Sequence, residues 1–253
     1  MEILNVTTRV AEQTTNNLRS SGQIPVVIYG HGLKPAVVSV EKIAFGKVWR
    51  SAGESTLIDL MLDSKEAVKV LKNGGIVIFP TDTAIGIGCR IDNPNAVKRL
   101  FKIRKRPSTQ VTSVLVDSLK MAQRYLLPID REIIDRLVEQ YWPGALTLIL
   151  QCIEVKVPKL VRGGGSTLGV RMPNHTTTLN IIKNLGVPIL GPSANFHGEK
   201  TPFRFDDLNP ELVKKADYVL NGEVGLEKNV STVVDCTVEP WKIIRHGAIP
   251  LSF

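Results

Sequence analysis

The sequence predicts an α/β protein in which short buried strands alternate with amphipathic helices. Residues 76–79 form an apolar run that is long enough for a buried strand and too short for a helix. Residues 93–105 begin with Asn-Pro and place Val97, Leu100 and Phe101 on one side, which indicates a helix with a basic outer face. With 43% hydrophobic residues over 253 positions, the chain holds enough apolar surface for a normal core.

The first sixty residues are typical of a small, mostly β unit. We expect strands at residues 3–8, 24–29, 35–40 and 56–62, a short helix at 10–19, and a second helix at 43–52. Gly53 ends the second helix, and a Gly-His-Gly turn at residues 30–32 separates the second strand from the third. A new unit begins near residue 63, so we expect one domain at 1–62 and another at 63–253.

The larger unit continues with helices and strands, each predicted from its periodicity and from flanking glycine or proline residues. We expect helices at residues 64–73, 94–105, 118–126, 130–141 and 176–185. We expect strands at residues 76–79, 111–116, 146–151, 168–171, 187–190, 218–220, 232–235 and 242–245.

The net charge of +8 is concentrated in the larger unit. Residues 1–63 contain six Lys or Arg and six Asp or Glu, so their net charge is zero. The densest basic cluster comprises Lys98, Arg99, Lys102, Arg104, Lys105 and Arg106, with no acidic residue between them. This distribution indicates that the larger unit binds an anionic substrate or nucleic acid, and a solvated basic helix face is the alternative.

The composition argues against a membrane protein, a secreted protein and a metalloprotein. No apolar run approaches the roughly 18 residues that cross a bilayer, and the first residues lack the basic start and apolar core of a signal peptide. The three cysteines lie far apart, and the four histidines do not complete a metal signature. We therefore expect a cytoplasmic protein with no structural metal and no membrane partner.

Polar side chains follow two of the predicted strands at the points where those strands end. The first group, directly after residues 76–79 and Pro80, is Thr81, Asp82 and Thr83. The second group is Ser193 and Asn195, which face the same way in an extended segment because they are two residues apart. Ligands in open α/β sheets bind beyond the carboxyl ends of strands, so we predict a binding crevice here, although an ordinary Asx or Ser turn also explains the second group.

Later segments contain further candidate anion-binding groups. Residues 163–165 are three glycines, which let backbone N–H groups approach an anion, but no Walker A Lys follows and a flexible loop explains them better. Arg171 ends a predicted strand, and its planar fork suits a carboxylate. Ser231 and Arg245 are polar residues at the edges of apolar strands, each compatible with a structural role. No Ser/His/Asp or Cys/His order indicates a covalent nucleophile.

Seven motifs occur in an order and spacing that resemble the YrdC family. They are Pro-Thr-Asp-Thr (80–83), Arg-Lys-Arg-Pro (104–107), Trp-Pro-Gly-Ala-Leu-Thr (142–147), Leu-Gly-Val-Arg-Met-Pro (168–173), Pro-Ser-Ala-Asn (192–195), Ser-Thr-Val-Val-Asp (231–235) and Ile-Ile-Arg-His-Gly-Ala-Ile (243–249). The resemblance covers about residues 64–250. It implies a three-layer α/β domain (α+β in some schemes) with a twisted mixed sheet around a basic cavity.

The same resemblance implies a nucleotidyltransferase, a threonylcarbamoyl-AMP synthase. Such an enzyme converts L-threonine, bicarbonate or CO2, and ATP into threonylcarbamoyl-AMP and pyrophosphate. Its product serves threonylcarbamoyladenosine formation in tRNA, so the resemblance also implies partners that transfer the group to tRNA. Mg²⁺ would accompany ATP as a ligand of the triphosphate.

The resemblance also implies roles for individual residues of this chain. Arg104 and Arg106 would be the catalytic cation pair. The residues that hold threonine would be Thr81, Arg171, Ser193 and Ser231, with Arg171 on the carboxylate. The residues that hold the nucleotide would be Arg104, Thr167, Asn195 and Arg245.

The chain departs from the family pattern at four places. Arg104 stands where the family usually has Lys, and Ile85 follows Ala84 where the family has Val-Tyr. Val111 lies in a Gln-Val-Thr segment that replaces Asn/Lys-Pro-Leu, and Phe203 replaces a threonine. A guanidinium fork is not equivalent to an ammonium point charge, so these changes bear on rate and substrate choice more than on the fold.

Residues 5–62 resemble the N-terminal domain of the bacterial 5S-rRNA-binding ribosomal protein of the general-stress type. The similarity rests on Arg9, on Leu-Arg-Ser-Ser-Gly-Gln-Ile-Pro (18–25) and on Gly-Glu-Ser-Thr-Leu-Ile-Asp-Leu (53–60), and it stops before the last strands of that domain. The zero net charge argues against strong rRNA binding, which relies on neutralising phosphates. Three interpretations stay open: a degenerate RNA-binding appendage, a structural or partner-docking module, and a fusion relic without a role.

Two rival functions stay open for the whole chain. One is a non-catalytic, translation-associated protein that binds tRNA or rRNA through the basic cavity and the N-terminal module. The other is a related carbamoyl-adenylate chemistry on a different substrate, which the departures at Ile85 and Phe203 prompt.

Overall fold

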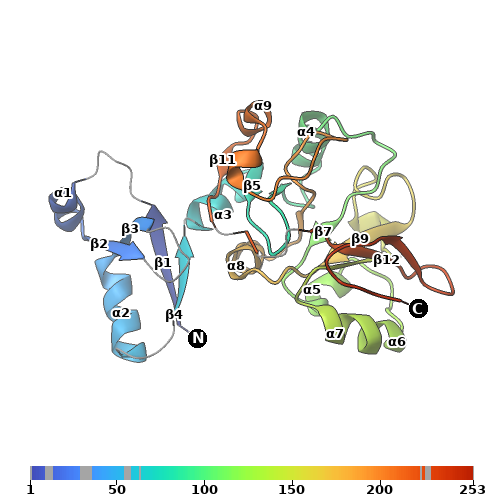
Figure 1. The fold of residues 1–253 in the computed structure, drawn as a ribbon, viewed down its shortest axis with the longest axis horizontal. Coiled ribbons are helices and arrows are strands. Elements are labelled where there is room, and N and C mark those ends of the chain that lie inside the picture. The colour runs from blue at the N-terminus through green and yellow to red at the C-terminus, as the bar shows by residue number, and fades with distance from the viewer. Residues whose placement is uncertain are drawn as a thin grey trace. The chain divides into compact units, whose positions relative to one another are not determined.

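The computed structural model describes residues 2–8, 14–28, 36–53, 58–62, 64–222, 224–225 and 229–252. The chain divides into two compact units, Met1–Glu66 and Ala67–Phe253 (Figure 1). Each unit has its own cluster of buried apolar residues. Within the described part of the chain, no helix is both long and apolar enough to cross a bilayer.

The smaller unit is a four-stranded sheet with two helices. Its strands are β1 (Glu2–Thr8), β2 (Gln23–Ile28), β3 (Ala36–Glu41) and β4 (Ile58–Leu62), in the order β2-β3-β1-β4. β1 pairs parallel with β4, and the other pairs are antiparallel. Its small core contains Leu4, Val6, Val38, Val40 and Val48.

The two helices of the smaller unit are α1 (Thr15–Ser20) and α2 (Lys42–Ala52). α2 ends at Gly53 as predicted, and the glycine there has a φ of 69°, which side chains rarely adopt. The helix predicted over residues 10–19 begins only at Thr15, and residues 9–13 lie outside the described residues, as does the predicted turn at 30–32. The strands of this unit agree with the predicted ones to within two residues.

The larger unit contains two sheets. The six-stranded sheet has the order β10-β7-β9-β8-β12-β13, and the three-stranded sheet has the order β11-β5-β6. The strands are β5 (Val77–Phe79), β6 (Gly86–Gly88), β7 (Val114–Leu115), β8 (Leu146–Gln151), β9 (Thr167–Arg171), β10 (Ile189–Leu190), β11 (Tyr218–Val219), β12 (Thr232–Asp235) and β13 (Lys242–Arg245). Both sheets mix parallel and antiparallel pairs. The predicted α/β class with twisted mixed sheets is confirmed, with two sheets in place of one.

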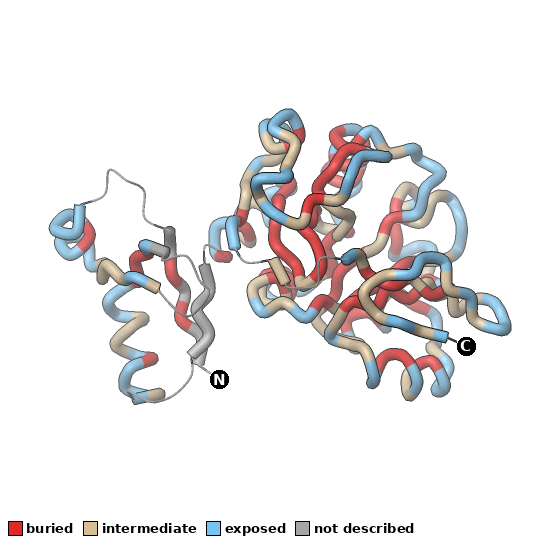
Figure 2. The backbone as a smooth tube through the Cα atoms, in the orientation of Figure 1, coloured by how far each residue is buried: buried red, intermediate tan, exposed pale blue. Residues whose placement is uncertain are grey.

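The helices of the larger unit cover these sheets. They are α3 (Ser64–Lys72), α4 (Pro94–Ile103), α5 (Leu119–Gln123), α6 (Arg131–Ile133), α7 (Glu139–Tyr141), α8 (Thr176–Leu185) and α9 (Pro210–Val213), with a π-helical turn at Ile134–Val138 and 3₁₀ turns at Glu154–Lys156 and Phe205–Asp207. α4 and α9 lie beside β5 and β11, and α5 to α7 gather on the other side of the unit (Figure 1). Buried residues are concentrated in the strands of this unit, and exposed residues in its helices and outer loops (Figure 2).

The helix predicted from the Asn-Pro pair is confirmed. Asn93 Oδ1 accepts the backbone N–H of Ala96 at 3.0 Å and Pro94 occupies the first turn, so the side chain caps the helix as expected. Val97, Leu100 and Phe101 are buried on its inner face.

Two predictions for the larger unit need correction, and two short elements were not predicted. The strand predicted over residues 111–116 is reduced to β7, because the N–H of Thr112 bonds to Val161 O outside the sheet. The helix predicted over 130–141 contains the π-helical turn. β6 was not predicted because two glycines flank one apolar residue. Position 88 requires glycine, since a Cβ there would collide with Leu190 O of β10. α9 was not predicted because four residues are too few to show a helical period.

Because the two apolar clusters are separate, we expect the larger unit to fold by itself. A chain that begins at residue 64 should melt cooperatively, within about 3 °C of the corresponding transition of the full chain. Calorimetry of both chains checks this expectation. The control is Leu71→Ala, which truncates a fully buried side chain of α3 and should destabilise the unit by about 2–5 kcal/mol. An unfolded 64–253 chain would show that the units share a core.

Candidate active site

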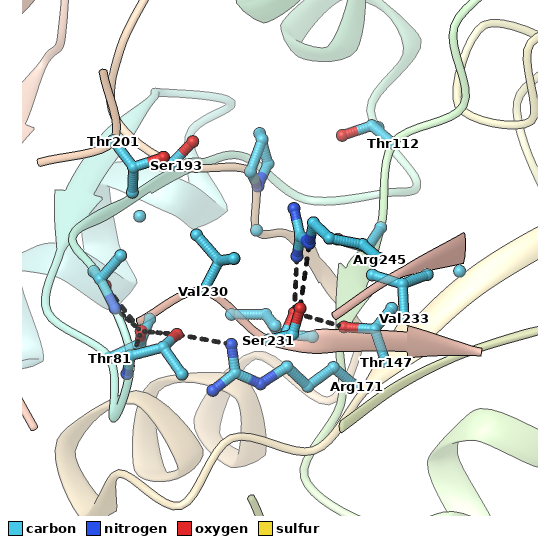
Figure 3. A pocket seen from close by; sticks show the side chains of 18 of the residues that line it. Thr81, Thr112, Thr147, Arg171, Ser193, Thr201, Val230, Ser231, Val233 and Arg245 are labelled. Atoms are coloured by element: carbon cyan, nitrogen blue, oxygen red, sulfur yellow. Dashed lines mark hydrogen bonds between the residues drawn. The ribbon is translucent and has the colours of Figure 1, made fainter. Parts of the chain in front are cut away.

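One row of residues crosses the six-stranded sheet and forms the floor of a cavity of about 250 Å³ (Figure 3). The row consists of Leu115, Arg171, Thr147, Val233 and Arg245, each paired with the next across neighbouring strands. Paired residues point to the same face of a sheet. The register therefore gathers two cations and a hydroxyl from three strands into one cavity.

The cavity wall comes from the two strand ends that the sequence singled out. The turn after β5 contributes Thr81, Thr83 and Ile85, and the segment after β10 contributes Gly191 and Ser193. An isolated bridge joins Gly86 to Ser193, and the N–H of Ala194 donates to Ile85 O at 2.8 Å. The two segments lie side by side, so the predicted crevice at the carboxyl ends of strands is present.

The Thr81 hydroxyl is used inside its own turn. It donates to Ala84 O at 2.6 Å and accepts the N–H groups of Thr83 and Ala84 at 3.2 and 3.1 Å. A hydroxyl has one proton to donate, so Thr81 shapes the turn and offers a ligand no hydrogen. The neighbouring Thr83 is buried and also lines the cavity.

Arg171 connects the two sheets. It ends β9 and is only 6% exposed. Its Nε donates to Gly144 O at 2.9 Å, its Nη1 to Thr83 Oγ1 at 2.7 Å and its Nη2 to Asp82 Oδ1 at 2.5 Å. Burial lowers the pKa of Arg171, and the Asp82 carboxylate opposes that fall. These bonds use three of the five N–H donors of a guanidinium, which leaves two for a ligand.

Ser231 links Arg245 to Thr147. Nη2 of Arg245 donates to Ser231 Oγ at 2.9 Å and its Nε donates to Ser231 O at 3.0 Å. Ser231 Oγ and Thr147 Oγ1 are 2.9 Å apart (Figure 3). The guanidinium of Arg245 is therefore held in place by a neutral residue and keeps its charge.

Arg104 is the least exposed of the four arginines that line the cavity. It is 3% exposed, and burial lowers its pKa to about 10, with nearby Arg106 as the second cause. Among the described residues, no group bonds to its Nη1 or to the hydroxyl of Thr112, and both residues line the cavity. Buried polar atoms normally have partners, so these two mark where an anionic or polar ligand fits.

Arg106 also lines the cavity, where it braces the adjoining loop. Its Nε donates to Gln110 O at 3.5 Å and its Nη2 to Val111 O. Lys105 between the two arginines points elsewhere, with its Nζ 4.8 Å from the ring centre of Phe196. The three-residue basic motif therefore sends its first and third side chains to the cavity.

The structure thus brings seven of the nine predicted site residues to one cavity. The seven are Thr81, Arg104, Arg106, Arg171, Ser193, Ser231 and Arg245. Thr167 and Asn195 are not among its described lining residues. Thr167 shares a face with Gly169 and Arg171 but lies farther along β9. Asn195 is buried, and its backbone oxygen accepts a hydrogen bond from Arg104.

Three threonines line the cavity without having been predicted to bind a ligand: Thr112, Thr147 and Thr201. Thr83, which belongs to the first strand-end group and was expected at the crevice, also lines it. Thr147 had a signal, because it is a hydroxyl in an otherwise apolar strand that belongs to a recognised motif. Of the departures from the family pattern, Ile85 and Val111 line the cavity with Arg104, whereas Phe203 is not among the described lining residues. The glycines at 163–165 are also not among them.

The donor set of the cavity does not fit a metal bound by the chain. The described lining residues offer hydroxyls and guanidinium groups and include no Asp or Glu. Within the described ranges, no group of three or more His, Cys, Asp or Glu side chains could hold a metal ion. Burial raises the pKa of Cys89 and of Cys236 to about 12, so neither thiol is poised as a thiolate nucleophile.

The buried pair of Arg171 and Asp82 predicts a large effect on stability. Asp82→Ala should lower the free energy of unfolding by about 3–5 kcal/mol, because it leaves a buried guanidinium without its counter-charge. The matched control is Asp92→Ala, which breaks the more exposed pair with Arg90 and should cost less than about 1 kcal/mol. Urea denaturation of both variants measures the difference, and equal losses would contradict it.

The comparisons with known proteins agree with the resemblance. The family model Sua5/yciO/yrdC, described as "Telomere recombination", matches residues 69–247. The model of the ribosomal L25p family matches residues 4–73. Both resemblances noted in the sequence are confirmed, and the second extends past residue 62, where we expected it to stop.

Named relatives match the larger unit. The threonylcarbamoyl-AMP synthase of Pyrococcus abyssi is 34% identical over 189 residues, which cover 74% of this chain and 54% of that protein. The threonylcarbamoyl-AMP synthase of Bacillus subtilis is 32% identical over 187 residues, which cover 73% of this chain and 53% of that protein. The chain spans about half the length of these relatives.

A solved structure agrees with the matches to these two synthases. The crystal structure of P. abyssi Sua5 complexed with L-threonine has a TM-score of 0.69 to this chain at 32% identity, and the match covers 74% of this chain and 55% of that one. With a family model that spans most of the larger unit and relatives above 30% identity, the chain belongs to the Sua5/YciO/YrdC family.

Proposed function

We propose that the larger unit is a threonylcarbamoyl-AMP synthase, a nucleotidyltransferase that makes threonylcarbamoyl-AMP and pyrophosphate from L-threonine, bicarbonate or CO2, and ATP. The observation that carries the proposal is the charge of the cavity. Arg104, Arg106, Arg171 and Arg245 line it, and its described lining contains no carboxylate. A reaction between two anions needs such a site, and relatives of this chain carry the name of the synthase.

The threonine site in this proposal is the floor of the cavity beside Arg171. Two N–H donors of that guanidinium are not used by any described residue, and they suit the carboxylate of an amino acid. The hydroxyls of Thr83 and Ser231 are within the same cavity and give a threonine polar partners. A neighbouring structure in the family was solved with L-threonine, which supports this choice of substrate.

The nucleotide site in this proposal is at the wall, beside Arg104. The free Nη1 of Arg104 and the free hydroxyl of Thr112 suit phosphate oxygens. Arg106 and Arg245 add charge around them. The lining offers no carboxylate for Mg²⁺, so in this proposal the ion stays on the triphosphate and water, and the chain's own contribution is the four guanidinium groups.

The proposed chemistry is positioning and charge neutralisation. The threonine amine adds to CO2 and loses a proton, which gives a carbamate. A carbamate oxygen attacks the α-phosphorus, and the bond to the bridging oxygen of the β-phosphate breaks, so pyrophosphate leaves. When bicarbonate is the carbon source, one water is released as well. The arginines lower the barrier because they offset the charge that the two anions bring together.

The product and its partners follow from the same proposal. Threonylcarbamoyl-AMP is a mixed anhydride, so a second reaction class must consume it by transferring the acyl group, which we propose is the modification of adenosine in tRNA in the cytoplasm. The ribosomal-protein-like unit has no residue in the described lining, and its three interpretations stay open.

The direct test is pyrophosphate release by the full chain. Release should require threonine, bicarbonate and ATP together, and should fall to background when any one is omitted. Replacing threonine with serine, valine or carbamoyl phosphate tests the alternative of a related carbamoyl-adenylate chemistry on a different substrate, which rests on the departures at Ile85 and Phe203. Tight tRNA binding without any such turnover would favour the non-catalytic RNA-binding alternative and overturn the proposal.

Arg171→Ala separates the two substrates. It should raise the KM for threonine by about 10- to 100-fold, since a charge-assisted hydrogen bond contributes about 1.5–3 kcal/mol, and should change the KM for ATP by less than about threefold. Steady-state kinetics with each substrate varied in turn checks this. The control is Arg131→Ala, which removes a guanidinium that is 78% exposed on α6 and should change neither value. An unchanged KM for threonine would refute the assignment.

A further inference from the structure

Among the described residues, Asn195 alone bonds to the side chain of Arg104, which lines the cavity. Its Nε donates to the backbone oxygen of Asn195 at 3.1 Å, and its Nη2 donates to Asn195 Oδ1 at 3.4 Å. The remaining terminal nitrogen, Nη1, has no partner among the described residues. A guanidinium is planar, so fixing two of its nitrogens fixes the direction of the third.

Asn195 is itself fully engaged. Its Nδ2 donates to Phe196 O at 3.0 Å and to Glu199 O at 2.8 Å, which uses both amide hydrogens. Its Oδ1 also accepts the Ser193 hydroxyl at 2.5 Å. These partners fix which end of the amide is the oxygen, because the nitrogen faces two carbonyl groups. The amide therefore has no hydrogen left to donate to a nucleotide.

The backbone locks the same geometry. The N–H of His197 donates to Arg104 O at 2.8 Å, so the end of α4 and the segment after Ser193 are tied together next to the side-chain contacts. Asn195 is 8% exposed and is not among the described residues that line the cavity. Its side-chain oxygen contacts both Arg104 and the cavity-lining Ser193.

The neutrality of Asn195 has a functional consequence. Asp82 holds Arg171 with a carboxylate, which cancels much of the charge of that guanidinium. Asn195 holds Arg104 with two neutral oxygens, so the guanidinium is oriented and keeps its full charge for an anion. A lysine at position 104 would carry a compact ammonium group, which has no planar fork for two oxygens to orient.

We propose that Asn195 is a positioning residue that aims Nη1 of Arg104 at a phosphate group. The inference rests on the proposed function for the identity of the anion, and on the contacts around Arg104 for the role of Asn195. It differs from the nucleotide-binding role that the sequence resemblance implied for Asn195.

A double-mutant cycle on the full chain tests this role. We would measure by calorimetry the dissociation constants of inorganic triphosphate and of ATP for the wild type, Asn195→Ala, Arg104→Ala and the double variant. Asn195→Ala should weaken both ligands by the same factor, about tenfold, because both depend on the aimed guanidinium. In the Arg104→Ala background the same change should weaken them by less than about threefold, because no guanidinium is left to aim.

The control is Asn184→Ala on α8, an exposed amide that bonds only within its helix and should change neither constant. Asn195→Ser, which keeps a hydroxyl in place of Oδ1, serves in the same cycle if melting shows that Asn195→Ala does not fold. Additive losses, a loss confined to ATP, or a wild type that does not bind triphosphate would each overturn the inference. Triphosphate binding that shows the expected cycle without threonine-dependent pyrophosphate release would overturn the proposed reaction and leave the inference standing.

Discussion

The contact between Arg171 and the turn after β5 holds the candidate site together. Arg171 ends a strand of the six-stranded sheet, and Asp82 and Thr83 follow a strand of the three-stranded sheet, so their bonds join the two sheets across the cavity. Both partners of the ion pair are buried, with side-chain exposures of 8% and 12%. Such a pair gains little free energy in total, but losing one partner is costly, so it specifies how the sheets meet.

The cavity keeps its positive charge because most of its cations are held by neutral groups. Ser231 holds Arg245, the carbonyl groups of Gln110 and Val111 hold Arg106, and Asn195 holds Arg104. Burying these charges and keeping them near one another costs folding free energy, and the lowered pKa of Arg104 reflects its burial first and the neighbouring Arg106 second. A bound anion offsets that cost, and linkage then makes the folded state more stable when the ligand is present. The arrangement suits a site that recruits anions.

Much of the fold was predictable because strands and helices in this chain follow local rules. β8, β12, β13 and α8 have the predicted boundaries, since clear alternation, a capping residue or a flanking glycine marks each of them. β6 and α9 were missed because they are too short to show a period. The polar residues at strand ends were also predictable as site candidates, because ligands in open α/β sheets bind beyond the carboxyl ends of strands.

The sequence by itself determined most of the elements, the location of the positive charge and the seven motifs that identify the family. Only the tertiary structure decided which of those polar groups face one another. Pairing register placed Arg171, Thr147 and Arg245 in one row, although nothing local relates positions so far apart in the chain. Tertiary contacts also assigned Thr81 to its own turn and Asn195 to Arg104, and left the Thr112 hydroxyl without a partner among the described residues. A hydrogen bond depends on distance and direction in space, and those are properties of the folded chain.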